Sequence, residues 1–176
     1  MKTNIKTITY SGFFIALGVL FPQIFHLFGG TGPVFLPMHI PVLLAGFFLG
    51  AKAAALVGLI TVLLSAAFTG MPAVPVLYFM LVEVSIYGLA AGLAYKKFNL
   101  NIYLSLILAM ITGRLALATT VYTLQPLLGL QLSPFVYMST AIMKGIPGMI
   151  IQILFIPVTV LSLERALVKR YDYKAS

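Results

Sequence analysis

The stretch MHIPVLLAGFFLGAKAAALVGLITVLLSAAF, residues 38–68, decides the fold. Its single charge is Lys52, which stands where two long apolar runs meet. Apolar runs of this kind, broken by one cation, are typical of two membrane-spanning helices joined by a tight turn. We expect spans at Met38–Gly50 and Ala51–Phe68, with Pro41 close enough to the first helix start to be tolerated there.

Similar apolar runs flank this stretch on both sides and predict four further spans, at Ile8–Phe28, Val76–Tyr95, Asn101–Leu124 and Phe135–Leu163. The chain has 176 residues, of which 61% are hydrophobic and 8% charged, and a soluble domain could not bury so much apolar surface. We therefore expect an all-α integral membrane protein in which residues 1–176 form a single six-helix membrane domain. The last run is longer than a bilayer requires, so Glu164–Tyr173 is expected to project into the cytoplasm.

Lys and Arg outside these runs would all fall on one side of a membrane. The connections Gly29–Pro37, Thr69–Pro75 and Gln125–Pro134 carry no charge. Cytoplasmic loops retain Lys and Arg, so both termini are expected to be cytoplasmic. The cations concerned are Lys2, Lys6, Lys52, Lys96, Lys97, Arg165, Lys169, Arg170 and Lys174.

The net charge of +8 would suggest a nucleic-acid partner in a soluble protein. In this chain the same charges are explained by topology and by anionic lipid at the cytoplasmic face, so no nucleic acid is expected. The first apolar run lacks a small-residue cleavage site and is expected to be a retained helix. With no Cys and only two His, neither a thiolate site nor a catalytic zinc site is expected, and no cofactor is implied.

The span at Met38–Gly50 is too short to cross a membrane unaided. Its 13 residues reach only about 20 Å, against a hydrocarbon core of ~30 Å. We expect the uncharged segment Gly29–Pro37 to dip into the protein from the outer face as non-helical backbone. Such backbone is tolerated at membrane depth where it is buried in protein or lines a cavity. This first outer loop is therefore expected to line or cover a cavity that opens to the outside.

Three charges lie within the spans: Glu83, Arg114 and Lys144. Counted from the outer ends of their helices, they lie about 10, 15 and 13 Å deep. Intramembrane charges are rare and usually functional, and convergence at one depth is what a binding site near the outer face requires. His39 belongs to the same level, near the outer end of its span.

Two structural explanations compete with this site. The three charges could form an ion-pair network that only stabilises the bundle, and Lys144 could extend to the outer interface. Two cations and one anion leave a residual +1, however, and a bound carboxylate would compensate it, with Arg114 suited to a bidentate contact. His39 is more often a hydrogen-bonded helix-start residue than a ligand contact, and His26 is best explained as an interfacial polar residue.

Tyrosines are plentiful in the outer halves of the spans: Tyr78, Tyr87, Tyr122 and Tyr137. Such aromatics more often belong to a core or a lipid-facing belt than to a ligand site. Some are nonetheless expected to line the cavity, with Tyr87 and Tyr122 as substrate-binding candidates beside the charged groups.

Small residues recur four apart at Gly12/Ala16, Gly46/Gly50, Ala54/Gly58 and Gly88/Gly92. This spacing lets helix backbones approach closely in a membrane. Packing within the chain is favoured over packing against a partner. No glycine loop typical of nucleotide sites and no GxSxG sequence is present, so the chain is not expected to be an enzyme.

The stretch FLPMHIPVLLAGFFLGAKAAALVGLITVLLSAAFTGMP, then a span with Glu83 and YGLAAGLAYKK, resembles the substrate-binding S components of energy-coupling factor (ECF) transporters. These are six-helix, vitamin-binding plasma-membrane proteins of bacteria and archaea. The resemblance implies partnership with a transmembrane T component and two cytoplasmic ATPases, and a substrate site near the outer face gated by the first outer loop. A small-xxx-small motif in the first helix contacts the T component in that family, and here the matching residues are Gly12 and Ala16.

Two functions remain from the sequence. The first is a high-affinity subunit of an ATP-driven importer that captures a vitamin or related metabolite, carboxylate-bearing by the charge argument. The second is a self-sufficient channel or ion-coupled carrier, which requires a polar path through inner halves that contain almost no polar residues. A membrane-embedded enzyme ranks third, because no nucleophile–base pair is evident. The sequence leaves open which metabolite is bound and whether the ATPases are shared or dedicated.

Overall fold

The computed structural model describes residues 4–27, 29, 31–129 and 133–175, with side chains described except at 26–27 and 167–175. Several positions discussed above lie outside this description: Lys2 and Phe28, and the side chains of His26, Lys169, Arg170 and Lys174.

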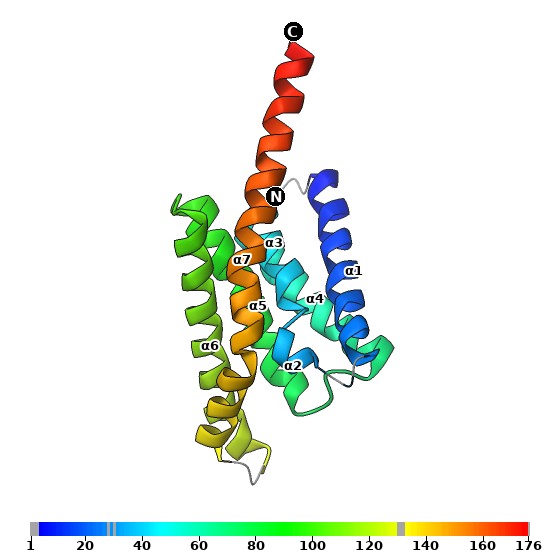
Figure 1. Ribbon diagram of the computed structural model, residues 1–176. Helices are drawn as coiled ribbons and strands as arrows, with labels where there is room; N and C mark the ends of the chain where they lie inside the picture. Colours follow the sequence, from blue (N-terminus) through cyan, green and yellow to red (C-terminus); the bar gives the residue numbers. More distant parts are fainter. Residues whose placement is uncertain (1–3, 28, 30, 130–132, 176) are drawn as a thin grey trace.

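All regular structure in the described ranges is helical (Figure 1). The elements are α1 (Ile5–Leu27), α2 (Gly32–Phe35), α3 (His39–Leu49), α4 (Ala51–Thr69), α5 (Val76–Gly92), the π-helical turn η1 (Leu93–Lys97), α6 (Ile102–Leu127) and α7 (Pro134–Ala175). Within the described residues, six helical stretches are long and apolar enough to cross a membrane. The six expected spans are confirmed, and most of their ends agree within three residues.

The first outer loop differs from expectation because part of it is helical. Residues Gly32–Phe35 form the single turn α2, which ends at Leu36 in a left-handed conformation with φ 49°. This turn packs against α7, where a β-carbon on Gly148 would lie 2.7 Å from the Phe35 carbonyl carbon. α2 and α3 together make one apolar span, Gly32–Leu49. The segment thus supplies the missing length by entering the bundle as a broken helix.

The α3–α4 turn explains why Lys52 marks a chain reversal. Gly50 joins the two helices with φ 86° and ψ 175°, a conformation that a side chain would strain. The reversal therefore needs one glycine, and Lys52 follows in the first turn of α4.

Small residues bring α3, α4 and α5 into close contact. A β-carbon on Gly88 would lie 2.6 Å from the Ala54 carbonyl oxygen, and one on Gly58 would lie 2.8 Å from the Val84 carbonyl oxygen. A β-carbon on Gly46 would lie 2.8 Å from the Ala91 β-carbon and 2.9 Å from the Gly88 carbonyl oxygen, and one on Gly92 would collide with Gly50 and Ala51 at the α3–α4 turn. Ala54/Gly58 and Gly88/Gly92 therefore pack within the chain through both residues, and Gly46/Gly50 does so through Gly46 alone, because a β-carbon on Gly50 would meet nothing within 4 Å.

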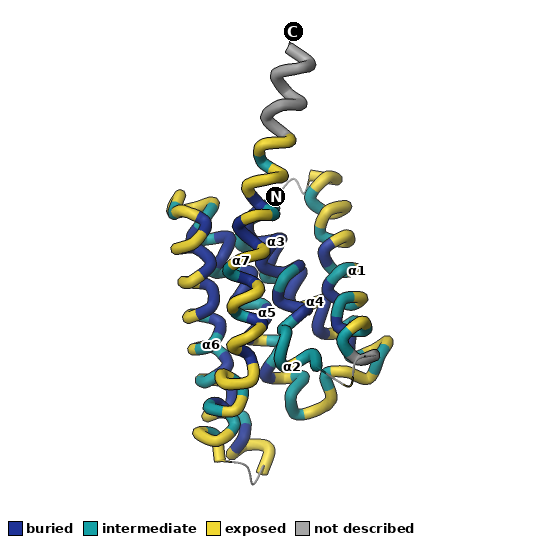
Figure 2. The backbone as a smooth tube through the Cα atoms, in the orientation of Figure 1, coloured by how far each residue is buried: buried dark blue, intermediate teal, exposed yellow. Residues whose placement is uncertain are grey.

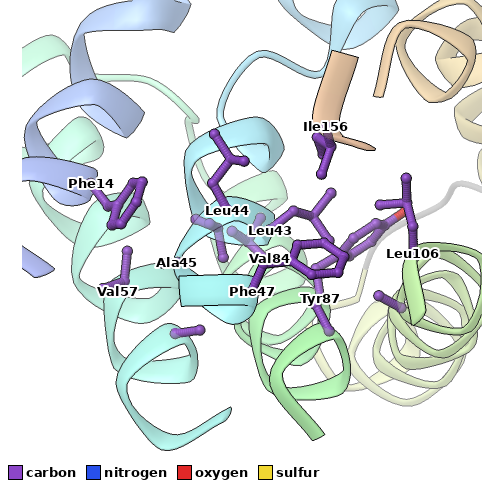
Figure 3. Packing of buried hydrophobic residues seen from close by; sticks show 14 of the residues in the cluster. Phe14, Leu43, Leu44, Ala45, Phe47, Val57, Val84, Tyr87, Leu106 and Ile156 are labelled. Carbon is purple, nitrogen blue, oxygen red and sulfur yellow. The ribbon is translucent and has the colours of Figure 1, made fainter. Parts of the chain in front are cut away.

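Helix α3 forms the centre of the core. Eight of its residues are buried, from His39 to Phe47. In Figure 3, Leu43 and Phe47 lie between Phe14 and Val57 on one side and Leu106 on the other. The residues exposed in Figure 2 on the outward faces of α1, α6 and α7 include many large apolar side chains, as expected of surfaces that contact lipid.

Both described ends of the chain lie at the same end of the bundle (Figure 1), together with the α3–α4 and α5–α6 turns. Helix α7 has 42 residues and continues past the bundle at this end. Its length of about 63 Å is roughly twice a ~30 Å hydrocarbon core, which agrees with a projecting final segment. The charge-poor connections lie at the opposite end.

Candidate functional site

A cavity of about 640 Å³ lies at the end of the bundle that holds the charge-poor connections. Its walls come from the end of α1, α2, the start of α3, the α4–α5 loop and the adjoining halves of α5, α6 and α7. The first outer loop lines it through Gly32, Pro33, Leu36 and Pro37. The volume lies within the range of small-molecule sites.

Seven polar or charged residues contribute to the lining: His39, Glu83, Arg114, Ser133, Tyr137, Thr140 and Lys144. The remaining lining residues are glycine, alanine, proline, valine, leucine or methionine. A largely apolar cavity with a few convergent polar groups is the usual form of a ligand site.

Glu83 and Arg114 form an ion pair at the wall of this cavity. Arg114 Nη1 donates a hydrogen bond of 2.9 Å to Glu83 Oε1. The side chains are 5% and 13% exposed, so the pair is held largely away from water. Removing either partner would leave a buried charge uncompensated. The stabilising ion pair considered from the sequence is thus present for these two residues.

Arg114 keeps hydrogen-bonding capacity beyond this pair. Its Nε and Nη2 atoms are buried and have no hydrogen-bond partner among the described residues. A guanidinium presents five donors in a fixed plane, and buried donors usually find acceptors. Arg114 therefore serves Glu83 with one nitrogen and keeps two others without a partner, of which Nη2 lies against Gly145 of α7, where an added β-carbon would be 2.6 Å away.

His39 lies on the other side of Glu83. Its Nε2 is 3.9 Å from Glu83 Oε1, which is too long for a hydrogen bond. Neither ring nitrogen has a partner among the described residues, and the residue is 2% exposed. His39 is thus a buried cavity residue whose two ring nitrogens have no partner among the described residues.

Lys144 lines the same cavity but takes no part in the ion pair. It is exposed, and no described carboxylate lies within salt-bridge distance of it. With His39 neutral, the cavity wall carries two cations and one anion. The residual +1 inferred from the sequence therefore belongs to one continuous site.

The tyrosine that lines the cavity is not one of the two expected from the sequence, Tyr87 and Tyr122. Tyr87 is fully buried beneath His39, with ring centroids 4.8 Å apart in an edge-on arrangement, and it does not line the cavity. Tyr122 is 53% exposed and also lies outside the lining. Tyr78 is 41% exposed and is likewise not a lining residue. Of the four tyrosines, Tyr137 alone borders the cavity.

Sequence reasoning missed several lining residues. Thr140 and Val136 lie four and eight residues before Lys144, so helical spacing counted back from that lysine would have found this face. Met71 and Pro72 of the α4–α5 loop gave no comparable signal, because apolar residues are ordinary in a membrane protein.

The first-helix pair Gly12 and Ala16 faces outward. Both residues are exposed, and a β-carbon added at Gly12 would meet nothing within 4 Å. This distinguishes the pair from the other three small-residue pairs, each of which has at least one residue packed inside the bundle.

The model of the family "ECF transporter, substrate-specific component" matches residues 6–160. The chain belongs to this family of S components. The match begins in α1 and ends at residue 160 of α7, before the segment of α7 that projects from the bundle. Comparison with curated proteins and with solved structures gave no match.

As an S component, the chain is a substrate-binding membrane subunit of an ECF transporter. The family implies a small-molecule substrate and partnership with T and ATPase components. Six apolar helices and the family together make it a multi-pass membrane protein.

Proposed function

We propose that this S component captures a small carboxylate-bearing metabolite, such as a vitamin, at the outer face of a prokaryotic plasma membrane. It then delivers the metabolite through a T component driven by two cytoplasmic ATPases. The cavity at Arg114 and Lys144 is the proposed site. The observation that carries the proposal is the residual positive charge on the wall of a largely apolar cavity.

Electrostatics support an anionic substrate. Arg114 lines the cavity and is already paired with Glu83, yet its Nε and Nη2 have no hydrogen-bond partner among the described residues. Lys144 adds a second cation with no carboxylate of its own among the described residues. A carboxylate bound here would accept charge-assisted hydrogen bonds and neutralise the excess charge. Glu83 then acts as a positioning residue that fixes the Arg114 plane.

The charge pattern supports the orientation. Lys52, Lys96 and Lys97 lie at the end of the bundle opposite the cavity. Since Lys and Arg are retained on the cytoplasmic side, the cavity opens outward and both termini are cytoplasmic.

Packing beneath the site supports a binding subunit over a channel. Val42, Leu43, Tyr87 and Leu106 are fully buried in the centre of the bundle. Apart from the Tyr87 hydroxyl these side chains are apolar, so they do not form a continuous polar path from the cavity toward the cytoplasmic end. Transport therefore requires rearrangement with partner subunits.

The exposed pair Gly12 and Ala16 supports docking to the T component on the outward face of α1. Small residues allow a partner helix to approach closely. The surrounding face also presents Phe13 and Leu20, which are 56% and 59% exposed.

Mass spectrometry of the purified protein tests the function. We expect a small carboxylate-bearing molecule to co-purify with the wild-type protein. It should be absent from purified Lys144→Ala protein whose unfolding temperature equals that of the wild type. A liposome assay distinguishes this function from that of a channel or carrier. Liposomes that contain the chain without its partners should not release entrapped carboxylate. Partner-independent flux would instead establish a channel or carrier.

A further inference from the structure

Charge is unevenly distributed around the cavity. Arg114 and Thr140 come from α6 and α7, and Lys144 adds a second cation on α7. The α4–α5 loop supplies a different wall, made of Met71, Pro72, Ala73 and Val74. That wall has no polar side chain. The site therefore has a cationic wall and a hydrocarbon wall.

The helix packing places these two walls on different sides. Helix α7 packs against α2, α3 and α6, whereas α4 packs against α1, α3 and α5. The α4–α5 loop consequently reaches the cavity from the α1 and α5 side. A ligand whose carboxylate meets Arg114 must direct its other end toward this loop or remain outside the cavity.

The hydrocarbon wall is aliphatic rather than aromatic. The chain has no Trp, and the aromatic rings among the described lining residues are the phenol of Tyr137 and the imidazole of His39, neither of which belongs to this wall. Planar ring systems are usually held by aromatic stacking or edge contacts, which residues 71–74 cannot provide. Methionine and proline side chains instead offer an adaptable, saturated surface, with Met38, Met71 and Met80 lining the cavity.

We propose that the substrate is an amphiphilic monocarboxylate with an aliphatic body, its carboxylate on Arg114 and Lys144 and its body against Val76 and the 71–74 loop. This inference rests on the proposed function and adds the substrate class and its orientation. The volume of about 640 Å³ accommodates roughly 20 water-sized groups, which is ample for such a molecule.

Calorimetric titration in nanodiscs of zwitterionic lipid tests the substrate class, with empty nanodiscs as the partition control. The probes are butanoate, hexanoate, octanoate and the neutral octanamide. We expect affinity to rise about three- to fourfold for each added methylene. Octanamide should bind at least about 30-fold more weakly than octanoate, because it lacks the charge that Arg114 and Lys144 recognise.

A matched pair of substitutions on α5 tests the orientation. Val76 lines the cavity, whereas Val82 is 40% exposed and outside the lining. Val76→Thr keeps the side-chain shape and adds a hydroxyl, so octanoate affinity should fall about threefold or more while butanoate affinity is unchanged. Val82→Thr should bind both probes as the wild type does.

Affinity independent of chain length, or tighter binding of 2-naphthoate than of octanoate, would overturn the aliphatic assignment. So would wild-type octanoate affinity in Val76→Thr. In each case the proposed function survives if the co-purifying molecule still requires Lys144. If that molecule binds equally well to folded Lys144→Ala and Arg114→Ala proteins, the proposed function itself fails.

Discussion

Glu83 and Arg114 are the residues on which the site depends most. Their 2.9 Å hydrogen bond lies on the cavity wall, and each side chain is mostly buried. A buried pair of this kind contributes little net stability compared with apolar replacements, but breaking it is costly. The pair thus holds the Arg114 guanidinium in place at the cavity wall and leaves its Nε and Nη2 without a partner among the described residues.

Replacing Glu83 alone should destabilise the protein. In Glu83→Leu the Arg114 charge is left without its partner, which we expect to lower the free energy of unfolding by roughly 3–5 kcal/mol. The double variant Glu83→Leu/Arg114→Met should recover most of this loss, because both charges are then gone. Thermal unfolding of the purified proteins measures both effects. A Glu83→Leu protein as stable as the wild type would show that the ion pair is not maintained.

The depth of a residue along its helix could be predicted from the sequence, but the direction in which its side chain points around the helix axis could not. Counting residues placed Glu83, Arg114 and Lys144 at one level, and all three border the same cavity. The same counting placed Tyr87 and Tyr122 at suitable depths. Tyr87 is buried under His39, however, and Tyr122 faces away from the cavity lining. A single sequence carries too weak a periodicity in an apolar helix to distinguish lipid, core and cavity faces.

Helix α1 differs from the other helices in how it uses small residues. Close contacts with neighbouring parts of the chain surround four glycines: Gly46, Gly58, Gly88 and Gly92. Gly12, in contrast, has open space beside it. Four-residue spacing predicted close packing at all of these positions. It could not show which pair would remain free, because that depends on the arrangement of all six spans.

Replacing Gly12 with leucine should separate docking from folding. Gly12→Leu adds bulk on an open face, so we expect normal stability and normal substrate binding but weaker co-purification with a T component. Gly88→Leu is the matched control, because its side chain would collide with Ala54 and Val42 and should destabilise the bundle. Normal co-purification of Gly12→Leu, measured by affinity pull-down of the assembled transporter, would remove this face from the docking surface.

Short elements escaped prediction from the sequence. The single turn α2 has only four residues, fewer than any periodicity requires, and its helical form depends on packing against α7 at Gly148. The π-helical turn Leu93–Lys97 likewise gave no signal in an otherwise regular apolar span. Long spans were predictable because bilayer thickness fixes their length, whereas these turns are fixed by contacts within the bundle.

The whole molecule has a cavity at one end and its clustered cations at the other. Segregation of Lys and Arg predicted this polarity before any fold was considered, since the rule concerns connections rather than packing. The cavity itself depends on α2, the α4–α5 loop and α7 meeting in space. Its apolar wall could therefore not be predicted from the sequence.

Cysteine labelling tests the orientation, and the chain has no Cys to interfere. Thr31→Cys, Ala73→Cys and Ser133→Cys should react with a membrane-impermeant maleimide on intact cells. Lys52→Cys should react only after the membrane is opened, because its turn is expected to be cytoplasmic. The reverse pattern of labelling would invert the topology and turn the cavity toward the cytoplasm.

The most direct test of the account is calorimetric titration of the co-purifying molecule into Arg114→Ala and Lys144→Ala proteins. Tyr122→Ala is the matched control, because Tyr122 shares α6 with Arg114 but lies outside the cavity lining. We expect Arg114→Ala to bind at least about 30-fold more weakly, Lys144→Ala to lose affinity at unchanged stability, and Tyr122→Ala to match the wild type. Wild-type affinity in well-folded Arg114→Ala and Lys144→Ala proteins would contradict the claim that this charged wall binds the substrate.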